Sequence, residues 1–191
     1  MNKTVIILVF VVFGAPVLIA TLLHSEWFDT RLGGTRNYGD FVHPVVPLPE
    51  GWEIARNEGN ILVRDDLLER WQLVHRRQSA CDDVCLEDLY WLRQVRRAQD
   101  RHQPDVGLLL VSLTEIDDGT RQQILELADD FQIADGEAAR ALHDAFPYAS
   151  GNSSSYILDP QANIILQYSA DADPNGIRRD LRRLLTWTQR N

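Results

Sequence analysis

The sequence predicts an α/β fold with a central sheet and flanking helices, preceded by one N-terminal transmembrane helix. Two observations support this prediction. Short apolar runs alternate along the chain with segments whose apolar residues recur every three or four positions, which indicates strands alternating with helices. Ahead of them, residues 5–23 contain no charged side chain, which is typical of a membrane span.

The apolar segment 5–23 predicts an uncleaved membrane anchor, so that residues 1–23 form a cytoplasmic tip and a span. A helix of this length would cover about 28 Å, close to the thickness of the hydrocarbon layer. Cleaved signal peptides have shorter apolar regions and a small-x-small cleavage site, whereas Leu18 stands in the first small position here. Lys3 precedes the span, and the positive-inside rule therefore places the N-terminus in the cytoplasm. We expect a single-pass protein of the bacterial inner membrane with a periplasmic C-terminal domain.

The segment after the anchor, residues 24–50, is expected to be an extended spacer. Three prolines lie between His43 and Glu50, and proline favours extended backbone and removes amide donors. From residue 51 the pattern becomes that of a folded domain, which we expect to extend over 51–191. Its first apolar runs, 61–63 and 71–74, predict two strands or a hairpin.

The remaining elements complete the domain. A helix is predicted over about 82–101, because Cys85, Leu89, Leu92 and Val95 recur at helical spacing, and Ser79 is a candidate cap. The elements that follow are a strand buried on both faces at 106–113, helices at about 118–130 and 136–145, strands at 154–158 and 164–169, and a helix that begins at Asp173-Pro174. The order β-β-α-β-α-β-β-α, with a parallel crossover, an antiparallel hairpin and a closing helix, is the thioredoxin arrangement.

Composition excludes some function classes. The formal net charge is −9, which argues against nucleic acid as a partner because phosphates require a basic surface. The apolar strand 106–113 is not followed by a glycine-rich phosphate loop, so we expect no nucleotide site.

Cys81 and Cys85 are the only cysteines in the chain and lie at the start of the predicted helix. Amides at a helix N-terminus stabilise a thiolate, and Arg76 and Arg77 just upstream would help, while the two aspartates after Cys81 oppose it. At a spacing of four the two sulfurs share one helical face. They would close a disulfide if the first turn is distorted, or bind a soft ion such as Cu(I). The alternative is a structural staple, although so short a closed loop stabilises little.

Two stretches resemble the Sco/SenC family. Residues 81–89, CDDVCLEDL, resemble its CPDVCPEEL signature, and residues 156–160, YILDP, resemble its YLIDP hairpin. Sco/SenC proteins are membrane-anchored, thioredoxin-fold copper chaperones for assembly of cytochrome c oxidase. The resemblance covers about 55–190. It implies that Cys81 and Cys85 are a redox pair and copper ligands, and that the partner is a cytochrome c oxidase subunit or another assembly factor.

The chain departs from the family pattern, and its residues 112–115 do not match the acidic residues that follow the family's central strand. Asp82 and Leu86 replace its two prolines, Gly151 stands where the family has a copper-binding histidine, and Ser155 stands where thioredoxins have a cis-proline. Imidazole is the ligand that suits Cu(II) beside thiolates, so the family's Cu(II) site is incomplete here, whereas Cu(I) on two thiolates stays open.

Two histidines are candidates for a third metal ligand. His75 ends the strand before the cysteines, and His143 lies in the predicted helix 136–145. A single histidine at such a position is more often an ordinary core or surface residue.

Three functions remain open from the sequence. The first is a Sco-like accessory protein for oxidase assembly that acts through the dithiol of Cys81 and Cys85, by thiol–disulfide exchange or by carrying Cu(I). The second is a general thiol–disulfide oxidoreductase, although its pair would be spaced CxxxC rather than CxxC. The third is a non-catalytic binding module with a structural disulfide. Whether the chain is an enzyme is left undecided; an assembly factor with thiol–disulfide redox activity is the expected kind of protein.

Overall fold

The computed structural model describes residues 3, 12–15, 37–55, 60–147 and 152–188. The chain divides into two compact units, Met1–Arg36 and Asn37–Asn191. Most of the predicted span 5–23 lies outside the described residues. Within the described part of the chain, no helix is both long enough and apolar enough to cross a membrane.

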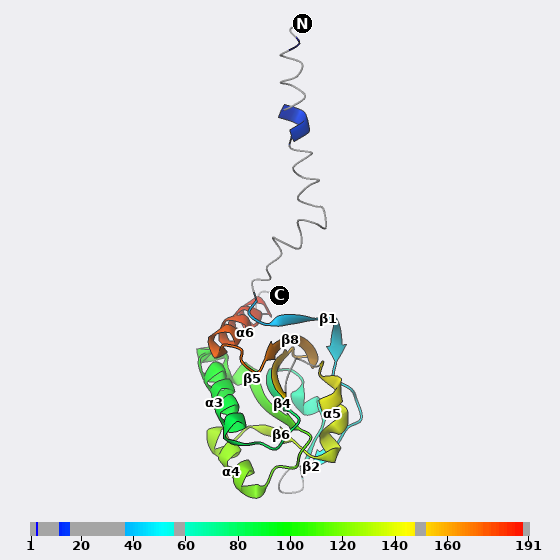
Figure 1. Ribbon diagram of the computed structural model, residues 1–191, viewed down its shortest axis with the longest axis vertical. Helices are drawn as coiled ribbons and strands as arrows, with labels where there is room; N and C mark the ends of the chain where they lie inside the picture. Colours follow the sequence, from blue (N-terminus) through cyan, green and yellow to red (C-terminus); the bar gives the residue numbers. More distant parts are fainter. Residues whose placement is uncertain (1–2, 4–11, 16–36, 56–59, 148–151, 189–191) are drawn as a thin grey trace. The chain divides into compact units, whose positions relative to one another are not determined.

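The second unit is built on a six-stranded mixed sheet with the strand order β1-β8-β7-β4-β5-β6 (Figure 1). Strands β4, β5 and β6 are parallel, and β7, β8 and β1 extend the sheet with antiparallel pairings. The central strands β4 and β5 are buried along their whole length. For β5 this agrees with its continuous apolar sequence, whereas β4 also buries Gln72, His75, Arg76 and Arg77. The strand bounds are β1 (Asp40–Pro47), β4 (Trp71–Arg77), β5 (Val106–Ser112), β6 (Gln132–Ala134), β7 (Ser153–Leu158) and β8 (Asn163–Ser169).

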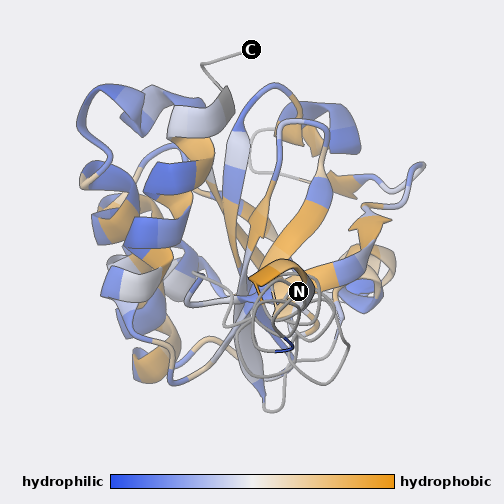
Figure 2. Ribbon diagram, turned by 90° about the horizontal axis from the view of Figure 1, so that it is seen from above, coloured by the Kyte–Doolittle hydropathy of each residue, from blue (hydrophilic) through white to orange (hydrophobic). Residues whose placement is uncertain are grey.

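Helices cover both faces of this sheet and bury two apolar cores. One core lies under the helices α3 (Asp83–Arg97), α4 (Asp118–Leu127) and α6 (Pro174–Thr188). The other lies under α5 (Arg140–Ala145) and the two-stranded sheet of β2 (Ile54–Ala55) and β3 (Ile61–Leu62). Figure 2 shows apolar residues concentrated in the strands between these layers, with polar residues on the outer faces of the helices. This is the predicted α/β fold with a thioredoxin-like central sheet.

The expected start of the domain needs correction. Residues 40–47, placed by the sequence in the spacer, form β1 and pair with β8 at the edge of the sheet. Proline is tolerated on an edge strand because one row of amides there has no partner strand, and the register shifts between Phe41 and Val46, around Pro44. The compact unit therefore begins at Asn37, not at Gly51. Of the two arrangements predicted for the runs 61–63 and 71–74, the structure has the two separate strands, because β3 pairs with β2 and β4 lies in the larger sheet.

The alternation of side chains along β4 determines which residues can approach the cysteines. Leu73 lies in the core under α3, whereas Val74 lies in the core under α5. Because successive strand residues point to opposite faces, His75 and Arg77 lie on the α3 side and Arg76 on the α5 side.

Candidate functional site: the disulfide at the start of α3

Cys81 and Cys85 form a disulfide, with their Cα atoms 5.2 Å apart. The two residues are not on one regular helical turn, because α3 begins at Asp83 with Asp82 as its N-cap. Cys81 lies before the helix. Its non-helical backbone lets the two sulfurs approach more closely than they would on one regular helical turn. Cys85 is fully buried in the core under α3, whereas Cys81 is half-buried and packs against the edge of that core. The pair therefore joins one partly exposed residue to one fully buried residue.

The N-cap of α3 is Asp82. The sequence had pointed to Ser79 for this position, and that prediction is wrong. The Asp82 carboxylate accepts a hydrogen bond of 3.0 Å from the backbone amide of Cys85. It also pairs with the guanidinium of Arg77 at 2.7 Å. The hydrogen bond from the Cys85 amide, and to a lesser extent the charge of Arg77, holds the pKa of Asp82 below its usual value. A carboxylate thus stays ionised next to Cys81 at neutral pH.

The two arginines expected to assist the thiolate are engaged elsewhere. Arg77 bonds Asp82, and its Nε also donates to Ser79 and to the carbonyl oxygen of Ala80, which holds the loop between β4 and α3. Arg76 is buried on the opposite face of the sheet, where its Nε donates to the carbonyl oxygen of His143.

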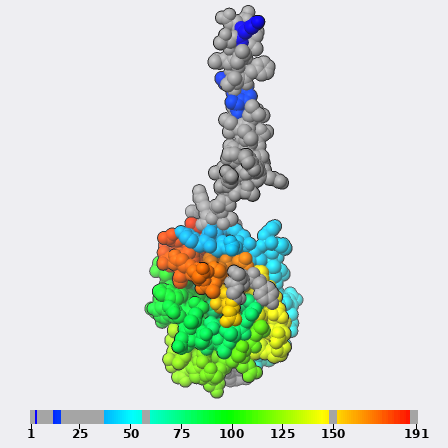
Figure 3. Space-filling view, in the orientation of Figure 1, coloured from blue at the N-terminus to red at the C-terminus, as the bar shows by residue number. Residues whose placement is uncertain are grey.

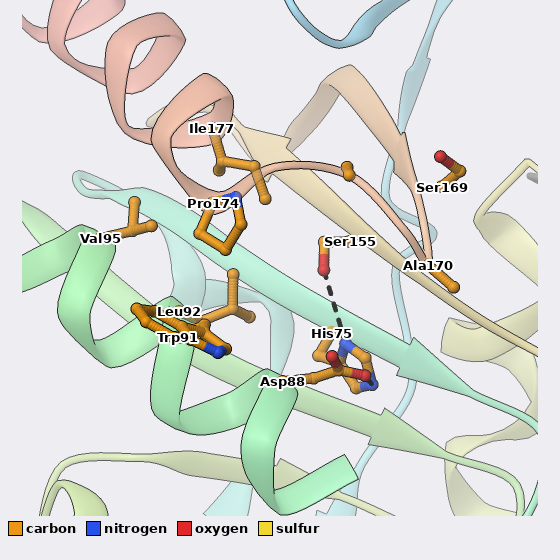
Figure 4. Close-up of a pocket in the computed structure, with 11 residues that line it drawn as sticks. His75, Asp88, Trp91, Leu92, Val95, Ser155, Ser169, Ala170, Pro174 and Ile177 are labelled. Atoms are coloured by element: carbon orange, nitrogen blue, oxygen red, sulfur yellow. Dashed lines mark hydrogen bonds and ion pairs between the residues drawn. The ribbon is translucent and has the colours of Figure 1, made fainter. Parts of the chain in front are cut away.

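His75 lies beneath α3 in a small cavity of about 40 Å³ (Figure 4). Its Nδ1 is 3.5 Å from the hydroxyl of Ser155, and its Nε2 is 3.6 Å from the carboxylate of Asp88, one turn after Cys85. Only 2% of His75 is exposed. Burial, and to a lesser extent the charge of Arg77, lowers the pKa of His75 to about 4, so the imidazole is neutral at pH 7. Burial raises the pKa of Asp88 above its usual value, although Arg77 opposes this.

The structure separates the two histidines proposed as third ligands. His143 lies on α5 with its Nδ1 3.5 Å from Nη2 of Arg76, on the face of the sheet opposite to α3. His143 is therefore not available to the cysteines, and only His75 lies on their side. Among the described residues, no group of three or more His, Cys, Asp or Glu side chains could hold a metal ion. Gly151, the family's histidine position, lies outside the described residues.

Two neighbours of His75, Asp88 and Ser155, were not proposed as site residues from the sequence. Asp88 carried a signal, because its spacing of three from Cys85 places it on the same helical face. Ser155 was noted only as a substitute for the cis-proline, but the antiparallel register of β4 and β7 sets it directly opposite His75. Only strand pairing could have revealed this contact.

Comparison with known proteins agrees with this geometry. Residues 71–188 match the family model described as the transmembrane-like, thioredoxin-like, C-terminal domain. The chain belongs to this family. No curated protein matches the sequence.

Solved structures give the same fold. Apo Sco1 from Thermus thermophilus is similar with a TM-score of 0.62 and 15% identity, covering 79% of this chain and 99% of that one. Copper-bound ScoI from Arabidopsis thaliana has a TM-score of 0.59 and 12% identity, with coverage of 73% and 99%. A thiol:disulfide interchange protein from a Bacteroides species has a TM-score of 0.52 and 14% identity, with coverage of 76% and 88%. The thioredoxin fold of this chain is thus Sco/SenC-like, as the sequence resemblance predicted.

Proposed function

We propose that this chain is a membrane-anchored, Sco-like thiol–disulfide exchange protein of the periplasm that assists the assembly of cytochrome c oxidase. The observation that supports it best is the asymmetry of the pair: Cys81 is half-buried just before α3, and Cys85 is fully buried in its first turn. An exchange pair needs one sulfur that a partner can reach and a second that is protected until the mixed disulfide forms. A structural staple needs no such difference.

The exchange proceeds in two balanced steps. In the reduced protein the Cys81 thiolate attacks one sulfur of a partner disulfide, a mixed disulfide forms, and the other partner sulfur leaves as a thiolate that takes up a proton. Cys85, after losing its proton, then attacks the Cys81 sulfur, which re-forms the Cys81–Cys85 bond and releases the partner as a dithiol. Two electrons pass from this chain to the partner. The reverse sequence would oxidise a partner dithiol.

The surroundings of the pair favour the disulfide over the dithiolate. Asp82 keeps a negative charge beside Cys81, and the charge of Arg77 is shared with that carboxylate. A second negative charge on Cys81 is therefore less well stabilised than at a helix N-terminus without an aspartate cap. We expect a pair that gives up electrons readily, which suits the reduction of a partner disulfide.

A second candidate function is carriage of Cu(I) as cargo on the two thiolates of the reduced pair. It is favoured by the thioredoxin-fold relatives whose structures contain copper, ScoI of Arabidopsis thaliana among them. Two thiolates are suitable Cu(I) ligands, but the disulfide must first be reduced by another dithiol. His75 is the histidine on the correct side of the sheet. Its neutral imidazole contacts Ser155 and Asp88 in the cavity under α3.

One experiment separates these functions. The full-length wild type, Cys81→Ser, Cys85→Ser and the double variant would be expressed in a strain that lacks the gene, and oxidase activity would be measured in the membranes. Loss in every cysteine variant supports the proposal, and full activity of the double variant rejects both cysteine-based functions. Competition of the reduced wild type with a Cu(I) chelator then distinguishes cargo from exchange. A His75→Gln control would lose Cu(I) affinity only if the imidazole is a ligand.

A further inference from the structure

The outer face of α6 carries a concentration of positive charge in an acidic protein. Arg178, Arg179, Arg182 and Arg183 occur within six residues, and all four are at least partly exposed. The only acidic residue of α6 is Asp180, which is completely buried. This set of four side chains, called the arginine face below, contrasts with the formal net charge of −9 for the whole chain.

Two members of the arginine face, Arg178 and Arg182, differ from the other two in their contacts. Among the described residues, the structure shows no ion pair for the side chains of Arg178 and Arg182. Arg183 faces Asp180 at 3.6 Å, and Arg179 lies over the ring of Tyr38 at 5.4 Å from its centroid. Guanidinium groups bind phosphate in bidentate fashion, which makes a phosphate-bearing surface a chemically suitable partner.

The start of the domain is attached to the same helix. The amides of Tyr38 and Gly39 donate to the buried carboxylate of Asp180, at 2.7 and 3.0 Å. Figure 3 shows the first described residues of the domain, in cyan, beside the C-terminal part of the chain, in orange and red. The first residues of the domain are therefore held against α6.

The connecting segment is short. Residues 24–36 can extend over at most about 45 Å. With the predicted anchor in place, Asn37, where the domain begins, can be no farther than about that distance from the end of the span. Trp187, in the last turn of α6, is 66% exposed, and tryptophan is enriched where proteins meet the membrane interface.

We propose that the arginine face of α6 binds the phosphate headgroups of anionic phospholipids and so orients the domain on the membrane. Each basic side chain near an anionic surface increases binding by about fivefold. The remainder of the domain is acidic and is repelled by the same surface, so this face selects one orientation. Lipid binding by the arginine face is expected to be the same whether Cys81 and Cys85 are oxidised or reduced.

The test uses the full-length chain in lipid nanodiscs made of phosphatidylcholine alone or mixed with phosphatidylglycerol. The readout is quenching of Trp187 by lipids brominated close to the headgroup, taken as the difference between wild type and Trp187→Phe. We expect strong quenching in the anionic discs, little in the neutral discs, and recovery of fluorescence at high salt, where charge interactions are screened. Equal quenching in both kinds of disc overturns the proposal.

Matched variants test the residues. Arg178→Gln with Arg182→Gln should weaken docking by about 30-fold and reduce the quenching to the level of neutral discs. Arg93→Gln with Arg97→Gln removes the same charge from α3 and should leave the quenching unchanged. If the α6 variant still docks on lipid but no longer binds an acidic assembly protein, the face belongs to a protein partner and the lipid proposal is wrong. The double cysteine variant should dock like wild type, which separates this result from the outcome for the exchange function.

Discussion

Lowering the pH below 6.5 should destabilise the oxidised domain because His75 is buried as a neutral imidazole. In the unfolded chain this residue titrates near 6.5, whereas burial lowers its folded pKa to about 4. Between these values the unfolded state binds more protons than the folded state, so the free energy of unfolding falls as the pH falls. The loss begins near pH 6.5 and is complete near pH 4.

The magnitude follows from the shift. Each pKa unit corresponds to 1.36 kcal/mol, so a shift from 6.5 to about 4 contributes about 3 kcal/mol. This is a large part of the 5–15 kcal/mol that stabilises a typical domain. Asp88 acts in the opposite direction: burial raises its pKa, so its protonation in the acid range offsets part of the loss.

The assay is urea denaturation of a soluble form that begins at Asn37, with the disulfide intact, at pH 7.5, 6, 5 and 4. Wild type is compared with His75→Gln, in which the carboxylates titrate as before but the imidazole is absent. The wild type should lose about 3 kcal/mol more than the variant between pH 7.5 and 4. Parallel losses in the two proteins would refute the placement of a neutral, solvent-excluded imidazole under α3.

Two further substitutions test the surroundings of the pair and the anchoring of β1. Asp82→Asn keeps an N-cap but removes the negative charge beside Cys81. The reduced protein should then react about two to five times faster with a small disulfide at pH 7, as measured by stopped flow. An unchanged or slower rate would contradict the electrostatic role given to Asp82. Asp180→Asn weakens the bonds that the buried carboxylate accepts from Tyr38, Gly39 and the Tyr168 hydroxyl. It should lower the free energy of unfolding by about 2–4 kcal/mol in urea denaturation, and a loss below about 0.5 kcal/mol would show that this contact does not hold the start of the domain.

Periodicity predicted the parts of the fold that bury long apolar faces. The helix over α3 followed from Cys85, Leu89, Leu92 and Val95, all of which are buried, and the strand at 106–113 followed from its continuous apolar run. The closing helix begins at Pro174, and its Asp173 accepts from the amide of Asn175, as the Asp-Pro pair indicated.

The short and edge elements could not be found in this way. β6 has only three residues, too few for a pattern, and β1 contains two prolines that argue against a strand unless the strand lies at a sheet edge. Its place is set by pairing with β8, which is remote in sequence.

The candidate site was only partly predicted, because some of its contacts join residues that are remote in sequence. The pair itself, its position at the start of α3 and its ability to form a disulfide followed from spacing and charge. Of the two candidate third ligands, His143 lies on the α5 side of the sheet, and the sequence pattern alone does not tell which face a helix covers. Arg76 is engaged with the backbone of His143 on the α5 side, a contact that no local pattern encodes.

The central claim is that Cys81 is the attacking sulfur and Cys85 the resolving one. Full-length Cys85→Ser and Cys81→Ser would be expressed in the native membrane, treated with acid and alkylated, and separated on non-reducing gels. The asymmetric burial predicts that Cys85→Ser accumulates a partner in mixed disulfide, that reduction releases it, and that Cys81→Ser accumulates none. Equal trapping by the two variants, or trapping by Cys81→Ser alone, would contradict the roles assigned to the two sulfurs.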